Sequence, residues 1–115
     1  MESKELLEIA AKACDDKRAE DIVALDMREV SLIADYFLIC NGSNERQVDA
    51  ISKAIKDAVE EKGIEVKKIE GKEQARWVLV DLDDVVVHIF HKDERSYYNI
   101  EKLWGDADNV PLSFN

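Results

Sequence analysis

Two apolar segments in the C-terminal half constrain the fold most strongly. Residues 77–82 and 85–90 each have the length and composition of a β-strand, and only Asp83 and Asp84 separate them. A two-residue connection between strands closes a tight antiparallel hairpin. The turn lacks the preferred glycine, so its type stays open. The sequence therefore predicts a sheet with this hairpin as a principal part.

A third apolar segment, residues 36–40, has no polar interruption. Such a run is typical of a central strand that is buried on both faces. Further patterns predict helices over about 3–17, 45–62 and 95–103, and strands over 21–27 and 64–69. In the second helix, Asn44 and Gln47 have the spacing of a capping box.

This order of elements predicts one α/β domain: a mixed sheet of about five strands with flanking helices. The strand 36–40, the helix 45–62 and the strand 64–69 are expected to form a right-handed βαβ unit. The segment from Gly105 onward, with the only proline, is expected to be irregular.

The chain is acidic, with 26 acidic and 16 basic residues and a formal net charge of -10. Nucleic-acid binders are usually basic, so we expect little or no direct nucleic acid contact. Solubility alone explains such a charge, and a basic protein partner is the alternative. Neither a signal-peptide pattern nor a membrane-length apolar run is seen, which favours a cytoplasmic location.

Two cysteines, Cys14 and Cys40, lie among apolar residues without CxxC spacing. This pattern predicts neither a zinc site nor a thioredoxin-like motif. Buried thiols of this kind suit a reducing compartment. We expect no metal and no cofactor.

A nucleotidyl-transfer site is one alternative for the polar residues. Gly42-Ser43 follows a buried strand, and Asp81 and Asp83 have the D-x-D spacing that binds magnesium under a triphosphate. However, Asp83 falls in the expected turn, and no lysine follows with Walker spacing. An ordinary strand-to-helix turn and a solvated acidic hairpin tip are the favoured interpretations.

Histidines offer no catalytic pattern. His88 shares a strand face with Val86 and Phe90, whereas His91 lies three residues on and so does not share that face. The pair is therefore a poor joint metal site.

One face of the first hairpin strand has the composition of a binding surface. Alternation places Trp77, Leu79 and Asp81 together on it. A face with tryptophan, leucine and a terminal aspartate suits a protein-binding hot spot, and burial of both faces in the core is the equal alternative.

Several long motifs resemble the Iojap-like ribosomal silencing factors. The resemblance runs through the first 107 residues and departs mildly at Gln47 and Ile100, where the family usually has histidine and leucine. The matching segments are Ala34-Asp35-Tyr36-Phe37-Leu38-Ile39-Cys40, Gly42-Ser43, Arg46-Gln47-Val48, Glu70-Gly71, Trp77-Val78-Leu79-Val80-Asp81, Asp84-Val85-Val86-Val87-His88-Ile89-Phe90, Arg95, Tyr98, Glu101, Leu103 and Trp104.

The resemblance implies a nucleotidyltransferase-like fold without the catalytic carboxylates, and a non-enzymatic homodimer when free. It also implies binding to the large ribosomal subunit through its fourteenth universal ribosomal protein, which sterically blocks the small subunit and represses translation. A role in large-subunit assembly is the alternative. Residues 1–107 would form the silencing-factor domain and residues 108–115 a tail. Within the domain, we expect the ribosomal-protein contact at Trp77, Leu79, Asp81, His88 and Tyr98.

Overall fold

A mixed sheet organises the computed structural model, which describes residues 2–94, 105 and 107–112. Along the chain the elements are α1 (Ser3–Asp16), β1 (Glu20–Asp26), β2 (Tyr36–Gly42), α2 (Glu45–Glu61), β3 (Lys68–Glu70), β4 (Trp77–Asp81), β5 (Val85–His91) and β6 (Asp108–Asn109). Within the described residues the sheet has six strands in the order β3-β4-β5-β2-β1-β6. β2 and β5 are parallel, and the other neighbours are antiparallel.

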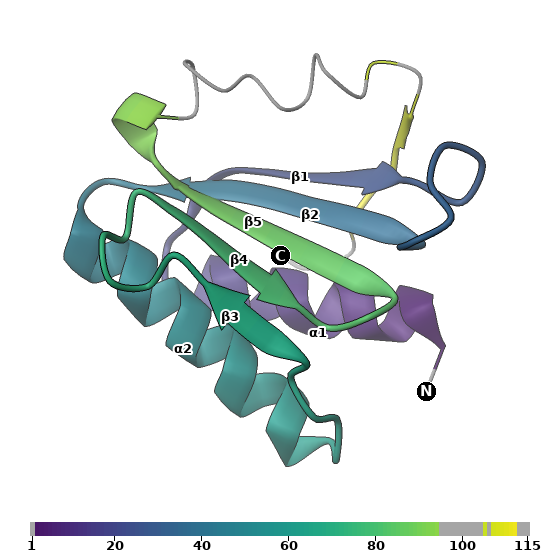
Figure 1. Cartoon of the computed structure of the whole chain (residues 1–115), viewed down its shortest axis with the longest axis horizontal. Helices are drawn as coiled ribbons and strands as arrows, with labels where there is room; N and C mark the ends of the chain where they lie inside the picture. Colours follow the sequence, from purple (N-terminus) through teal and green to yellow (C-terminus); the bar gives the residue numbers. More distant parts are fainter. Residues whose placement is uncertain (1, 95–104, 106, 113–115) are drawn as a thin grey trace.

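Both described helices lie on the same face of the sheet (Figure 1). Their apolar sides pack on β2, β4 and β5 to form the main core. The side chains that α2 contributes are spaced at helical intervals and fully buried: Val48, Ile51, Ile55 and Val59. Neither helix has the length and apolar character that a membrane crossing requires, within the residues described.

The start of α2 is fixed by side chains, as the capping-box spacing predicted. The Asn44 side chain accepts a hydrogen bond from the backbone N–H of Gln47 at 2.8 Å. In return, Gln47 Oε1 accepts from the backbone N–H of Ser43 at 2.6 Å, one residue before the expected partner. The helix stops before Gly63, whose φ of +82° favours glycine.

The two central strands are buried along their whole length. β5 is buried at every residue, and β2 at every residue but Phe37. The prediction of a central strand at residues 36–40 is confirmed. Side chains of both strands are buried on each face: Leu38 and Val87 belong to the main core under the helices, and Ile39 and Phe90 belong to a second buried cluster.

The neighbours predicted in the βαβ unit are wrong, because the strand that follows α2 does not lie beside β2. The strand after α2 begins at Lys68 rather than residue 64, and it pairs with β4 at the sheet edge. β5 takes the place beside β2. The physical reason is composition: apolar β5 needs a central position, whereas β3 is short and exposes Lys68 and Glu70, which suits an edge.

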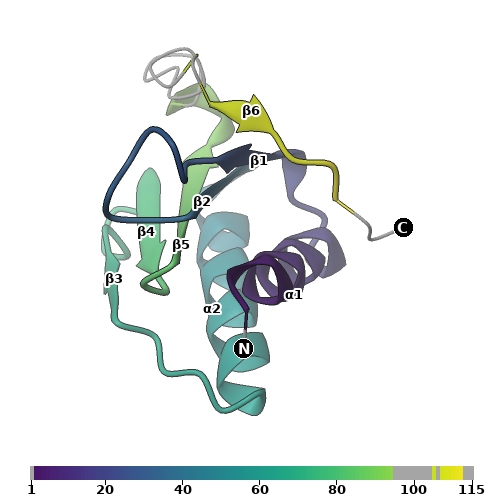
Figure 2. The same ribbon diagram turned by 90° about the vertical axis from the view of Figure 1, so that its right-hand side faces the viewer.

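A sixth strand replaces part of the irregular tail that the sequence predicted. β6 pairs with the end of β1, and the N–H of Val110 donates to the carbonyl of Ala24 at 2.8 Å (Figure 2). Asp108 and Asn109 show no alternation of apolar and polar residues, so the sequence pattern did not predict a strand there. The expected helix at 95–103 lies outside the described residues. The nucleotidyltransferase-like fold stays a prediction.

Candidate functional site

The face of β4 that points away from the helices carries the predicted binding row. Val78 and Val80 are fully buried under the helices, whereas Trp77, Leu79 and Asp81 are half-buried on the opposite face. We call these three residues the docking row. Alternation has produced one fully buried side and one half-buried side. Trp77 packs against a second buried cluster there, so burial of both faces in the core stays an alternative.

His88 lies beside the docking row on the neighbouring strand. The β4–β5 register places it opposite Leu79, and it is only 5% exposed. The indole Nε1–H of Trp77 donates to His88 Nδ1 at 3.2 Å. Adjacent strand pairing therefore brings two of the predicted site residues into direct contact.

Aromatic rings surround this hydrogen bond. The ring of Phe37 meets that of His88 edge to face, with the centroids 4.8 Å apart. Trp77 stacks on Phe90 with the centroids 5.1 Å apart. Phe37, Trp77, His88 and Phe90 together form what we call the aromatic cluster. Edge-to-face and offset-stacked rings attract one another, so the cluster holds the tryptophan in one orientation.

The protonation state of His88 follows from its surroundings. Burial lowers its pKa from 6.5 to about 4, so the ring is neutral at neutral pH. Because Nδ1 accepts from Trp77, the proton lies on Nε2, and that buried atom has no hydrogen-bond partner among the residues that the structure describes. A neutral, enclosed imidazole of this kind positions its neighbours and is a poor proton shuttle.

Asp81 ends the docking row at the hairpin turn. Its Oδ1 accepts from the backbone N–H of Asp83 at 2.8 Å. This bond stabilises Asp83 at a φ of +76°, which explains how the turn closes without glycine. Asp83 itself is exposed and lies 3.5 Å from the ammonium of Lys67.

The arrangement that a nucleotidyl transfer enzyme would need is not assembled. Gly42 pairs with His91, whereas Asp81 pairs with Val86, so the glycine turn and the aspartates lie at opposite ends of the sheet. The N–H of Ser43, which could hold a phosphate, is taken by Gln47. In the described part of the chain no three His, Cys, Asp or Glu side chains could hold a metal together.

His91 is buried apart from His88, at the far end of β5. Its Nδ1 accepts from the backbone N–H of Asp93 at 3.2 Å, and its Nε2 lies 3.9 Å from a Glu45 carboxylate oxygen. Arg76 bonds the same carboxylate at 3.0 Å and that of Glu94 at 2.6 Å. These contacts tie the start of β4 to α2, a structural role.

Sequence comparison decides the family. The family model described as "Ribosomal silencing factor during starvation" matches residues 1–114. The chain belongs to this family. It is 68% identical over 114 residues to "Ribosomal silencing factor RsfS" of Bacillus subtilis (strain 168), a match that covers 99% of this chain and 97% of that protein.

Two further comparisons, with a plant protein and with a solved structure, extend this result. The chain is 35% identical over 105 residues to "Protein Iojap, chloroplastic" of Zea mays, covering 91% of this chain and 46% of the maize protein. A crystal structure from Bacillus halodurans has 58% identity and a TM-score of 0.86, and the match covers 96% of this chain and all of that one. The Iojap-like resemblance is thus confirmed.

For three aromatic residues, the sequence prediction and the described site differ. Tyr98, a predicted contact, lies outside the described residues. Phe37 and Phe90 were not predicted as site residues, although they complete the aromatic cluster. Only the register between β2, β5 and β4 places them there, and a single strand pattern does not contain that information.

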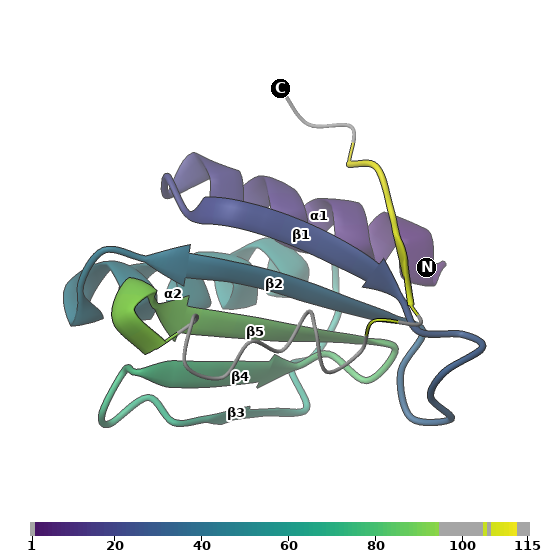
Figure 3. The same cartoon turned by 90° about the horizontal axis from the view of Figure 1, so that it is seen from above.

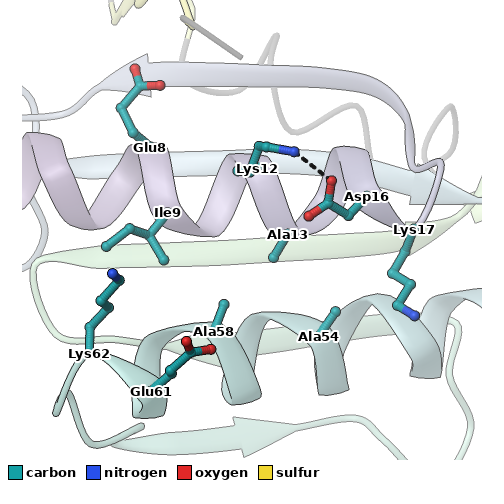
Figure 4. Close-up of a pocket in the computed structure, with 10 residues that line it drawn as sticks. All are labelled: Glu8, Ile9, Lys12, Ala13, Asp16, Lys17, Ala54, Ala58, Glu61 and Lys62. Atoms are coloured by element: carbon teal, nitrogen blue, oxygen red, sulfur yellow. Dashed lines mark hydrogen bonds and ion pairs between the residues drawn. The ribbon is translucent and has the colours of Figure 1, made fainter. Parts of the chain in front are cut away.

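A groove of about 820 Å³ also lies between α1 and α2 (Figure 4). Small side chains of the two helices face each other across it, and charged side chains form its rim. The residues that line it are Glu8, Ile9, Lys12, Ala13, Asp16, Lys17, Ala54, Ala58, Glu61 and Lys62. Three acidic and three basic side chains surround this groove without converging on one point, so it has no reactive arrangement.

Proposed function

We propose that this silencing factor binds the large ribosomal subunit through its fourteenth universal ribosomal protein. Bound there, it would sterically block association with the small subunit and so repress translation. One observation carries the proposal: a half-exposed tryptophan on the helix-free face, held by a buried histidine, in a protein of this family. A steric mechanism needs a rigid contact surface and no catalytic group.

Chemistry of the docking row supports a protein partner. Trp77 and Leu79 keep apolar area that a partner could remove from water, and tryptophan is enriched among the residues that dominate interface energy. Asp81 stands at the end of the row with one carboxylate oxygen left to accept from lysine or arginine. Tyr98 would lie beside this row.

Net charge supports the nature of that partner. Ribosomal proteins are mostly basic, and a chain with a net charge of -10 would be drawn to a basic protein and repelled by bare RNA. We therefore propose little direct nucleic acid contact. We also propose a cytoplasmic location, and a homodimer in the absence of ribosomes, which the family resemblance implies.

Sedimentation of the purified protein with separate ribosomal particles tests the proposal. We expect it to pellet with isolated large subunits, to stay in the supernatant with small subunits, and to reduce the joining of the two. Binding should weaken as salt rises, because exposed charges are screened. A protein that stays in the supernatant with every particle at low salt would overturn the proposed function.

A further inference from the structure

The loop between β1 and β2, residues 27–35, carries two exposed aliphatic side chains at its tip. Leu32 is 105% and Ile33 is 84% exposed. Every other large apolar side chain among the described residues is buried or partly buried. Single apolar residues on a surface are ordinary, but two adjacent ones on a projecting tip make an apolar patch. We call Leu32 and Ile33 the loop tip.

Hydrogen bonds hold this loop in one shape. The N–H of Met27 donates to the carbonyl of Asp35 at 2.7 Å, which closes the neck of the loop. Inside it, the N–H of Ser31 donates to the carbonyl of Met27 at 2.8 Å, and the N–H of Ile33 to the Ser31 hydroxyl at 3.1 Å. A loop already ordered in this way loses little conformational freedom on binding.

The loop tip stands next to the hairpin that ends the docking row. The backbone N–H groups of Asp35 and Tyr36 both donate to the carbonyl of Asp84, at 2.7 and 3.1 Å. Figure 3 shows the dark blue loop after β1 projecting beyond the sheet at the end where β4 turns into β5. The loop tip and Asp81 therefore lie at the same end of the sheet.

Charges around the loop tip select among possible partners. Glu29 and Asp35 belong to the same loop, Asp84 is bonded to its neck through the backbone, and Arg28 is paired with Asp26 at 2.6 Å. Anionic lipid and RNA would both be repelled by this surface. A basic protein surface with an apolar depression is complementary to it in both charge and polarity.

We infer that Leu32 and Ile33 form a second contact to the same basic ribosomal protein that the docking row binds. The inference rests on the proposed function, which supplies the partner. It extends the contact surface from β4 across the hairpin to a loop on the far side of β5. Burial of these two exposed aliphatic side chains gives the loop tip a substantial share of the affinity.

Affinity measurements with large subunits test this inference. In the full chain, Leu32→Ser with Ile33→Ser is compared with wild type and with Lys56→Ser plus Glu60→Ser. The control pair removes an exposed ion pair of equal and opposite charges from α2. We expect the loop variant to raise the Kd about tenfold or more, and the control to leave it unchanged. Because Leu32 and Ile33 belong to neither hydrophobic cluster of the described residues, the Tm should stay at the wild-type value.

Each result bears on one proposal. If wild type does not bind large subunits, the proposed function fails and the inference fails with it. If wild type binds and the loop variant binds equally well, only the inference is overturned. A loop variant that changes the oligomeric mass in solution but keeps wild-type affinity for subunits would assign the loop tip to a second copy of this chain, and would also overturn the inference.

Discussion

The indole nitrogen of Trp77 and Nδ1 of His88 lie 3.2 Å apart, joined by a hydrogen bond between neighbouring strands. With Phe90 stacked on its other side, the tryptophan is oriented before any partner arrives. A preoriented anchor avoids part of the entropy cost of binding.

Replacement of Trp77 should weaken ribosome binding more than it weakens the fold. Trp77→Ala is expected to cost about 2 kcal/mol or more of binding free energy, as at other aromatic anchors. Trp77→Phe should cost less, because a phenyl ring can still stack on Phe90 while losing the hydrogen bond. Affinity for large subunits measures both variants, and circular dichroism checks folding. A folded Trp77→Ala protein with wild-type affinity would remove Trp77 from the contact surface.

Stability should fall on acidification because of His88. Its pKa is about 4 in the folded protein against 6.5 for the ordinary group, so the unfolded chain binds a proton that the folded protein excludes. The contribution is complete above pH 6.5 and is lost as the pH falls towards 4, by roughly 3 kcal/mol at most.

Urea unfolding between pH 7 and pH 4.5 measures this dependence. His88→Phe should flatten the curve in that range. Parallel curves for wild type and His88→Phe would contradict the assignment to His88.

Two neighbours on β4 should separate binding from stability. Leu79 is half-buried on the docking row, and Val80 is fully buried under the helices. Val80→Ala should lower the free energy of unfolding by about 2 kcal/mol with little effect on affinity. Leu79→Ala should lower the affinity for large subunits with little effect on the free energy of unfolding. Equal effects of the two substitutions on both quantities would mean that the faces of β4 are not functionally distinct.

Two glycines with the same backbone angle form a matched pair. Gly63 and Gly71 have φ values of +82° and +83°, but a Cβ on Gly63 meets nothing within 4 Å, whereas one on Gly71 would lie 2.2 Å from the Trp77 carbonyl oxygen. Gly63→Ala should cost about 1 kcal/mol for the left-handed conformation alone. Gly71→Ala should cost distinctly more and should also weaken subunit binding, because β4 must shift at Trp77. Chemical denaturation compares the two, and equal losses would argue against the steric contact.

The two thiols should be unreactive in the folded protein. Cys14 and Cys40 are buried with their sulfur atoms 3.8 Å apart, and their mutual hydrogen bond together with burial raises the pKa of Cys14. Since the thiolate is the reactive form, a thiol reagent should label them only as fast as the chain unfolds. A Lys53→Cys variant, with its new thiol on an exposed site, supplies the fast-labelling control. Rapid labelling of the wild type without denaturant would contradict the buried pair.

Local features of the fold could be predicted from the sequence because their causes are local. The apolar segment at 36–40, the Asn44–Gln47 spacing and the alternation along β4 each depend on residues a few positions apart. The same alternation placed Trp77, Leu79 and Asp81 together. The docking row is in this sense a property of one strand.

Other features depend on pairing between distant segments. The position of β5 beside β2, the strand β6 and the aromatic cluster all follow from register, which no single strand specifies. The loop tip has no periodicity at all, since Leu32 and Ile33 lie in an irregular segment and only their exposure distinguishes them.

The parallel pairing of β2 with β5 has a consequence for synthesis of the chain. Tyr36 pairs with Val85, so α2, β3 and β4 must all have been made before the two central strands can meet. Closing so long a loop delays folding relative to local contacts. His88 and Phe90, the two aromatic partners of Trp77, both lie on β5. Trp77 can therefore contact them only after β5 has been made. A nascent chain completes the aromatic cluster only at that stage, so the orientation of Trp77 is fixed later than the helix α2 on the other face of the sheet.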